Sequence, residues 1–199
     1  MSKFLNSEIS GLVLAGGESR RMKGKDKGLV FFKNNPLIFY SIEILKNKVS
    51  NLLISANRNL ELYKNFGYPV ITDLTNKRLG PLGGIQAGLT KCTGKFLIVV
   101  SCDTPFLPKN LVETLYKKIE SNNYDIAIPY TLDSKNKKRT HPTTILLRSE
   151  LLQSLNNFLN NGGRKIDFWT CSHKVIEVYF DNENNFANLN SMKDLSIYE

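Results

Sequence analysis

Short apolar runs alternate with amphipathic segments along the whole chain. Residues 9–15 form an apolar run that ends at two glycines, which is typical of a buried strand leading into a tight loop. Residues 36–48 carry apolar side chains at helical spacing, with a proline in the first turn. Similar patterns predict strands at 52–55, 70–72, 96–100, 126–130, 144–147 and 175–180, and helices at 60–65, 85–91, 111–121, 149–160 and 191–195.

Alternating strands and helices indicate a largely parallel sheet with helices on both faces. Right-handed crossovers would connect its strands, and one or two later strands would be irregular. The 199 residues suit one domain with one core. We therefore predict a Rossmann-like α/β fold in a single domain, residues 1–199.

Ligands of such sheets bind beyond the carboxyl ends of the strands. The loop 16–27 follows the first predicted strand, Asp73 follows the strand at 70–72, and Asp103 follows the strand at 96–100. Because parallel strands end at one edge, we expect all three to share one rim of the sheet.

The loop after the first strand combines glycines with basic residues, which suits phosphate binding. Gly16 and Gly17 would let backbone N–H groups cradle oxygens, while Arg21 and Lys27 would supply positive charge. The alternative is a solvated glycine turn with a basic face. The loop matches neither G-x-x-x-x-G-K-[ST] nor G-x-G-x-x-G, which disfavours a P-loop NTPase and a dinucleotide-binding dehydrogenase.

Asp103 is the candidate magnesium ligand. Mg²⁺ in phosphate sites is held by one or two carboxylates together with substrate oxygens, so a single aspartate at a strand end can suffice. Asp103 and Asp73 could each instead cap the turn in which they lie. This alternative weighs more heavily for Asp73.

Charge and cysteine content narrow the setting. The net charge of +9 and pI near 9.4 favour anionic partners, and no nucleic-acid motif is present. The basic cluster 135–139 is a solvated loop or an acceptor-binding lid. Cys92, Cys102 and Cys171 suggest neither disulfides nor zinc. Without a signal-like start or an apolar run of ~20 residues, we expect a soluble cytoplasmic protein that does not bind membranes.

A series of short motifs resembles the molybdenum cofactor guanylyltransferases. The resemblance begins with residues 14–17, 20–22 and 26–28, and it extends from Ile9 to about Leu195. Its later motifs are Ala56-Asn57-Arg58, Asp73, Gly80-Pro81-Leu82-Gly83-Gly84, Cys102-Asp103-Thr104-Pro105, His141-Pro142-Thr143 and Phe186-Ala187-Asn188-Leu189-Asn190. The resemblance implies a three-layer nucleotidyltransferase fold with a mainly parallel, partly mixed sheet.

The resemblance also implies roles for individual residues. The guanine nucleotide would be bound by Leu14, Ala15, Gly16, Lys27 and Asp73, with Gly17 and Asp103 beside it. Asp103 would hold Mg²⁺, and residues 80–84 would form a backbone wall or, alternatively, a bare turn. Ser55 stands where better-known members carry an asparagine, and Asn57 is a possible substitute.

The acceptor half of the site would span about residues 130–195. The resemblance places His141, Asn188 and Asn190 there, with Arg164. Structural alternatives are that His141 merely starts a strand and that the asparagines cap a closing helix at Ser191.

The implied reaction is transfer of GMP from GTP to the terminal phosphate of molybdopterin, with release of pyrophosphate. Catalysis would rest on Arg21, Lys27 and Asp103 with Mg²⁺. Molybdoenzymes or their chaperones are further expected partners, and we expect a monomer or a weak oligomer. A related transferase using CTP or another phosphorylated acceptor, and a non-catalytic nucleotide-binding module, remain as alternatives.

Overall fold

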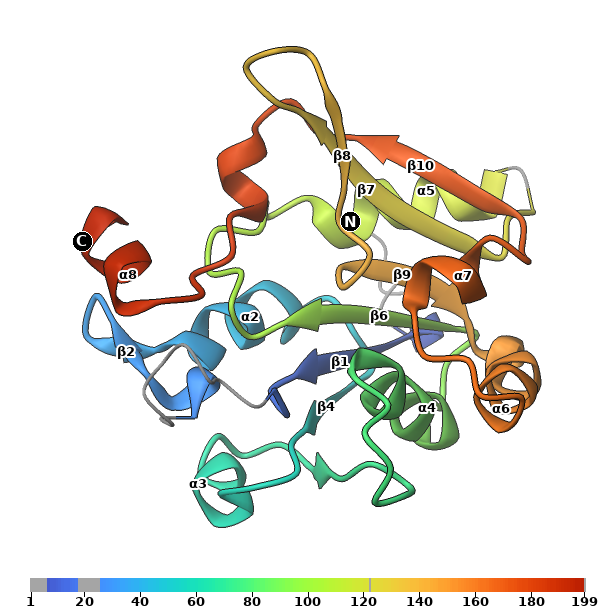
Figure 1. The fold of residues 1–199 in the computed structure, drawn as a ribbon, viewed down its shortest axis with the longest axis horizontal. Coiled ribbons are helices and arrows are strands. Elements are labelled where there is room, and N and C mark those ends of the chain that lie inside the picture. Colours follow the sequence, from blue (N-terminus) through green and yellow to red (C-terminus); the bar gives the residue numbers. More distant parts are fainter. Residues whose placement is uncertain (1–6, 18–25, 122, 199) are drawn as a thin grey trace.

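A computed structural model describes residues 7–17, 26–121 and 123–198, and its centre is a twisted sheet of eight strands (Figure 1). Seven strands follow the order β10-β7-β9-β6-β1-β4-β5, and β8 pairs with β7. Their bounds are β1 Ile9–Leu14, β4 Asn51–Ser55, β5 Val70–Ile71, β6 Phe96–Ser101, β7 Ile126–Leu132, β8 Lys138–Thr140, β9 Ile145–Arg148 and β10 Val175–Tyr179.

The sheet is mainly parallel and partly mixed, as predicted. Strand β1 pairs in parallel with β4 and β6, β4 with β5, and β10 with β7. Strand β9 lies antiparallel between β6 and β7, and β8 is antiparallel to β7. The carboxyl ends of β5, β4, β1 and β6 therefore meet at one edge, which is the predicted rim.

Helices cover both faces of the sheet and complete three layers (Figure 1). One apolar cluster joins Val13 and Ile98 to α2 and α5, and the other joins Leu12 and Leu97 to α4 and α6. Because both faces are covered, the central strands are apolar almost throughout. The helices are α2 Leu37–Leu45, α3 Leu60–Lys64, α4 Pro81–Lys91, α5 Leu111–Ser121, α6 Leu152–Asn160, α7 Ile166–Thr170 and α8 Met192–Tyr198.

Helix α4 begins earlier than its predicted start at Ile85. Its N-cap, Gly80, has a φ of +59°, and Pro81 occupies the first turn. A positive φ suits glycine, and proline suits a helix start because its missing N–H would have no helical partner there. Residues 81–84 are therefore helical, which corrects the alternative of a bare turn. The backbone wall against the nucleotide stays a prediction.

Several short elements were absent from the sequence prediction. They are the 3₁₀ turns η2 Lys27–Leu29 and η4 Glu183–Phe186, the hairpin of β2 Phe31–Phe32 and β3 Asn35–Pro36, strand β8 and helix α7. Each is too short to show a clear hydrophobic period. The helix predicted at 149–160 begins as the 3₁₀ turn η3 Ser149–Leu151 and continues as α6.

A small third cluster joins the segment 30–37 to the C-terminal part of the chain. Val30, Phe32 and Leu37 pack against Leu189 and Leu195, so the segment before α8 lies beside η2. Figure 1 shows α8 next to β2, on the side toward which the arrowheads of β1 and β6 point. Within the described ranges, no helix has both the length and the apolar character needed to cross a bilayer.

Candidate active site

The loops that leave the parallel strands begin at closely matched levels of the sheet. Ala15 N–H donates to Ser55 O at 2.8 Å, and Cys102 N–H donates to Leu14 O at 3.0 Å. These bonds continue the parallel ladders past the strand ends, so Gly16 and Asp103 leave the sheet from adjacent strands. Leu14, Ala15, Gly16 and Gly17 thus lie where the sequence predicted a ligand-facing rim.

Lys27 connects the predicted nucleotide half to the predicted acceptor half. Its Nζ forms an ion pair with Asp103 Oδ2 and donates to Asn190 Oδ1 at 2.5 Å. The side chains of Lys27 and Asp103 are only 14% and 11% exposed, so water screens their charges weakly. Asp103 O also accepts a hydrogen bond from Leu189 N–H at 2.9 Å.

Asp103 has one carboxylate oxygen that is well suited to a cation. Across the described residues, its Oδ1 is buried and accepts no hydrogen bond, and a buried acceptor without a partner is costly. A hard oxygen ligand in this position fits Mg²⁺, which takes its remaining ligands from phosphates and water. The same ranges hold no group of three or more His, Cys, Asp or Glu side chains that could enclose a metal.

Asp73 lies against the first turn of α4. Asn57 Oδ1 accepts its backbone N–H at 2.9 Å, and a Cβ added to Gly83 would lie 2.5 Å from Asp73 Oδ2. Burial raises the pKa of Asp73, and the Asn57 amide opposes this rise. The exposed Asn57 side chain also lies beside Gly16, with its Nδ2 3.3 Å from an added Cβ. Asn57 therefore spans Gly16 and Asp73.

Ser55 is buried in the packing between β4 and α4. It is 2% exposed, and an added Cβ on Gly84 would lie 2.6 Å from its Oγ and 2.6 Å from Leu14 Cδ2. Glycine at position 84 thus lets the first turn of α4 approach the sheet closely.

His141 lines a separate small cavity of about 120 Å³. Its ring stacks on Phe186 at a centroid distance of 4.4 Å, and its Nε2 is hydrogen-bonded to Thr131 Oγ1 at 3.0 Å. Burial, helped by the positive charge of Arg139, lowers the pKa of His141 to about 4. The imidazole is therefore neutral near pH 7. The cavity lining comprises Thr104, Arg139, Thr140, His141, Pro142, Thr143, Thr144, Phe186 and Asn188.

The two predicted acceptor asparagines take different positions. Asn188 lines the His141 cavity, whereas the Asn190 side chain reaches Lys27. Helix α8 is capped by Ser191 and Asp194: Asp194 Oδ2 accepts two backbone N–H groups, and Ser191 Oγ accepts that of Asp194. The Asn190 side chain is therefore used at the site rather than in the cap.

Two other basic segments have their own contacts. Arg164 donates to the carbonyls of Leu159 and Gly163 at the end of α6, which is a structural role. In the cluster 135–139, Lys138 pairs with Glu177, and Arg139 lines the cavity. Arg21 and the rest of residues 18–25 lie outside the described residues.

Sequence reasoning missed four residues that build these sites. Asp26 and Tyr63 are buried beside Lys27 and form a cluster with the partly exposed Arg58, and Phe186 supports His141. Three of the four lie within the motifs that carried the resemblance, but no pattern showed what they contact.

The fold and this rim together define an α/β nucleotidyltransferase. A family model described as a MobA-like NTP transferase domain matches residues 11–173. Molybdenum cofactor guanylyltransferases of Cupriavidus metallidurans and Cupriavidus necator are 41% and 43% identical to the chain, respectively. The alignments cover 96% of this chain in both cases, with 95% and 96% of those relatives. The chain belongs to the molybdenum cofactor guanylyltransferase family.

Solved structures share this fold. Molybdopterin-guanine dinucleotide biosynthesis protein A of Archaeoglobus fulgidus superposes with a TM-score of 0.77 at 25% identity, covering 96% of each chain. A CMP:2-keto-3-deoxy-manno-octonic acid synthetase complexed with CTP has the same fold, with a TM-score of 0.77 at 12% identity over 96% of this chain and 97% of that one.

Proposed function

We propose that this chain transfers the GMP moiety of GTP to the terminal phosphate of molybdopterin and releases pyrophosphate. The product is the guanine dinucleotide form of the cofactor. Family membership supports the acceptor and the reaction type. The observation that carries the proposal is the cluster of Lys27, Asp103 and Asn190, which joins the nucleotide and acceptor halves at the rim.

Lys27 is placed to act on phosphoryl oxygens. The in-line attack of the acceptor phosphate on the α-phosphorus shifts negative charge onto the leaving pyrophosphate, and a fixed cation stabilises that charge. The reaction requires no protein nucleophile, so positioning and charge neutralisation carry the catalysis. Arg21 belongs to the same proposal on sequence grounds.

Asp103 is the proposed ligand of Mg²⁺, through the buried oxygen that accepts no hydrogen bond from the described residues. When bound there, Mg²⁺ would neutralise phosphate charge and orient the triphosphate. Lys27 contacts the other carboxylate oxygen and thereby holds the aspartate in one orientation.

The nucleotide would lie between the β1 loop and α4. Among the described residues, an added Cβ at Gly17 would meet nothing within 4 Å, so these residues leave room for a ligand to approach this backbone closely. The N-terminus of α4 favours negative charge, and Asp73 with Asn57 presents hydrogen-bonding groups beside it. We assign recognition of the guanine base to Asp73 and Asn57, because Ser55 is buried against Gly84.

The acceptor would lie toward the His141 cavity. Arg139, Thr143 and Asn188 give this cavity cationic and neutral polar groups that suit a phosphorylated ligand. The neutral His141 ring can accept or donate a hydrogen bond without adding charge.

The test is transfer from α-labelled GTP to purified molybdopterin, with Mg²⁺ present or chelated and with CTP as the parallel donor. We expect magnesium-dependent labelling of the acceptor from GTP and stoichiometric pyrophosphate. Preference for CTP would move the function to cytidylyl transfer. Nucleotide binding without labelling from either donor would favour another acceptor or a binding module.

A further inference from the structure

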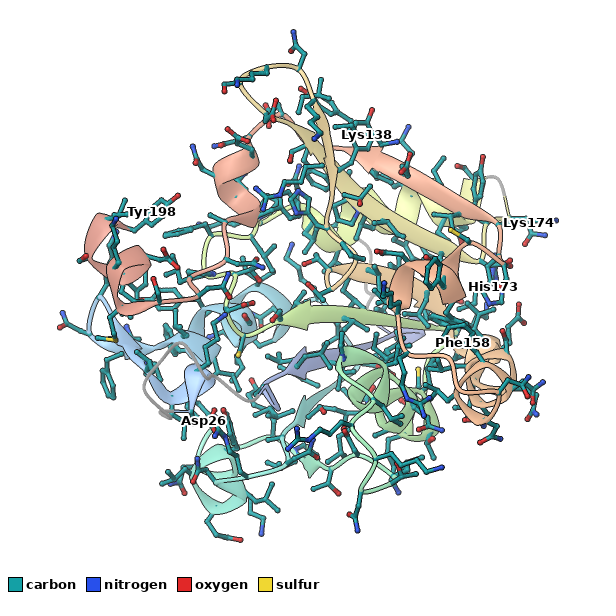
Figure 2. The ribbon with its side chains drawn as sticks, viewed as in Figure 1. Asp26, Lys138, Phe158, His173, Lys174 and Tyr198 are labelled. Atoms are coloured by element: carbon teal, nitrogen blue, oxygen red, sulfur yellow. The ribbon has the colours of Figure 1, made fainter. Side chains whose placement is uncertain are left out.

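A buried carboxylate lies immediately before Lys27. The Asp26 side chain is 3% exposed, and its two oxygens accept from Tyr63 OH at 2.6 Å and from Asn59 Nδ2 at 2.9 Å. Arg58 Nε lies 3.2 Å from Asp26 Oδ2. Figure 2 shows Asp26 above α3, the helix that carries Tyr63.

The same side chains also hold the beginning of the loop. Arg58 Nη2 donates to Gly17 O at 3.3 Å, and Tyr63 OH lies 3.5 Å from Ala15 O. Arg58 therefore contacts both Gly17 and Asp26, which flank residues 18–25. The connection between β4 and α3 thus holds both ends of this segment.

The cluster directly sets the position of the 3₁₀ turn that presents Lys27. Asp26 is the N-cap of η2, and its backbone carbonyl accepts from Leu29 N–H at 3.0 Å. An added Cβ on Gly28 would lie 2.5 Å from Tyr63 OH, so the turn rests against the ring. A shift of Asp26 would move η2 and, with it, the ammonium group that reaches Asp103.

We infer that Asp26, held by Tyr63 and Arg58, is a positioning residue that aims Lys27 at the phosphoryl groups. The inference rests on the proposed function. Asp26 would not itself contact substrate, because its side chain is buried and both its oxygens already accept hydrogen bonds. Around this buried carboxylate, paired charges and hydrogen bonds are stronger than in water. A displacement of about 1 Å at a catalytic group can reduce a rate about 100-fold.

The test is a double-mutant cycle with Asp26→Asn and Lys27→Met. It is measured both on the dissociation constant for GTP and on the guanylyl transfer rate. We expect Asp26→Asn alone to reduce kcat/KM about 100-fold. In the Lys27→Met background, the same change should weaken binding or transfer by less than about threefold, because residues acting as one unit are non-additive.

Two further variants separate positioning from folding. Tyr63→Phe removes one hydrogen bond to Asp26 and should reduce kcat/KM about tenfold, in the same direction. Glu61→Gln, on the same helix, removes only the exposed Lys64 pair and should change neither constant. Thermal unfolding of every variant identifies any loss of fold.

The outcomes distinguish the two proposals. Equal effects of Asp26→Asn with and without Lys27 would overturn the positioning role, as would a wild-type GTP affinity and rate for Asp26→Asn. A wild-type chain that binds GTP but transfers no GMP to molybdopterin would refute the proposed function. In that case the double-mutant cycle, measured by the dissociation constant for GTP, would still test the role of Asp26.

Discussion

Gly84→Ala tests how closely α4 must approach the sheet. A Cβ at this position would lie 2.6 Å from Leu14 Cδ2 and 2.6 Å from Ser55 Oγ, whereas ordinary contacts begin at 3.4 Å. Either the helix or the two side chains must therefore move by about 0.8 Å. Ser55 is buried, and the partly buried Leu14 packs against the core cluster that joins the sheet to α4 and α6, so we expect the helix to move.

Two opposing effects determine the size of the change. Replacing glycine by alanine within a helix stabilises by about 1 kcal/mol, while overpacking a well-filled core costs about 1–3 kcal/mol. We expect a net destabilisation of ~1–2 kcal/mol in the free energy of unfolding. Since the first turn of α4 lies at the proposed nucleotide site, a shift of this size should also lower kcat/KM for GTP by about 10- to 100-fold.

Gly83→Ala is the matched comparison. Its added Cβ would meet the Asp73 carboxylate at 2.5 Å, but this is the end of a half-buried side chain that can rotate. Urea unfolding should therefore place Gly83→Ala closer to wild type in stability than Gly84→Ala. A Gly84→Ala protein with increased stability and unchanged kinetics would refute the close-packing argument.

Three further predictions concern Lys27, the magnesium site at Asp103 and His141. Lys27→Ala should reduce kcat/KM by the factor that corresponds to a loss of ~3 kcal/mol of transition-state stabilisation. A near-wild-type rate would contradict the proposed role of Lys27. Chelation of Mg²⁺ should abolish transfer. Asp103→Asn should raise the Mg²⁺ concentration needed for the half-maximal rate. An unchanged Mg²⁺ concentration at half-maximal rate would place the ion elsewhere. Because His141 has a folded pKa of about 4, below the ~6.5 of an unfolded histidine, its stabilising contribution is complete above pH 6.5 and decreases as the pH falls toward 4. Wild type should lose ~1–3 kcal/mol more stability than His141→Gln over that interval in urea titrations, and parallel losses would contradict this assignment.

Much of the fold could be predicted because the long elements carry a clear hydrophobic period. The run at 96–100 predicted a fully buried strand, and β6 is one, with helices packed on both faces. The antiparallel position of β9 was harder to predict, since strand direction depends on which strands pair rather than on local sequence. The turn η2 and helix α7 have too few residues for a period to appear.

The candidate site divides in the same way. Asp73 and Asp103 could be proposed from the chain alone, because each follows a predicted parallel strand and parallel strands end at one rim. The contact between Lys27 and Asn190, 163 positions apart, could not be derived in this way. It depends on how Leu189 and Leu195 pack against the hairpin region.

The sequence by itself determined the alternating α/β architecture and the family, because these depend on local order and residue type. Tertiary structure alone decided that Asp26 is buried among Arg58, Asn59 and Tyr63. It also showed that residues 81–84 form the first turn of α4 and pack closely against the sheet, and that Asn188 and Asn190 face different partners. Their roles depend on contacts between distant segments, and such contacts form only when packing brings those segments together.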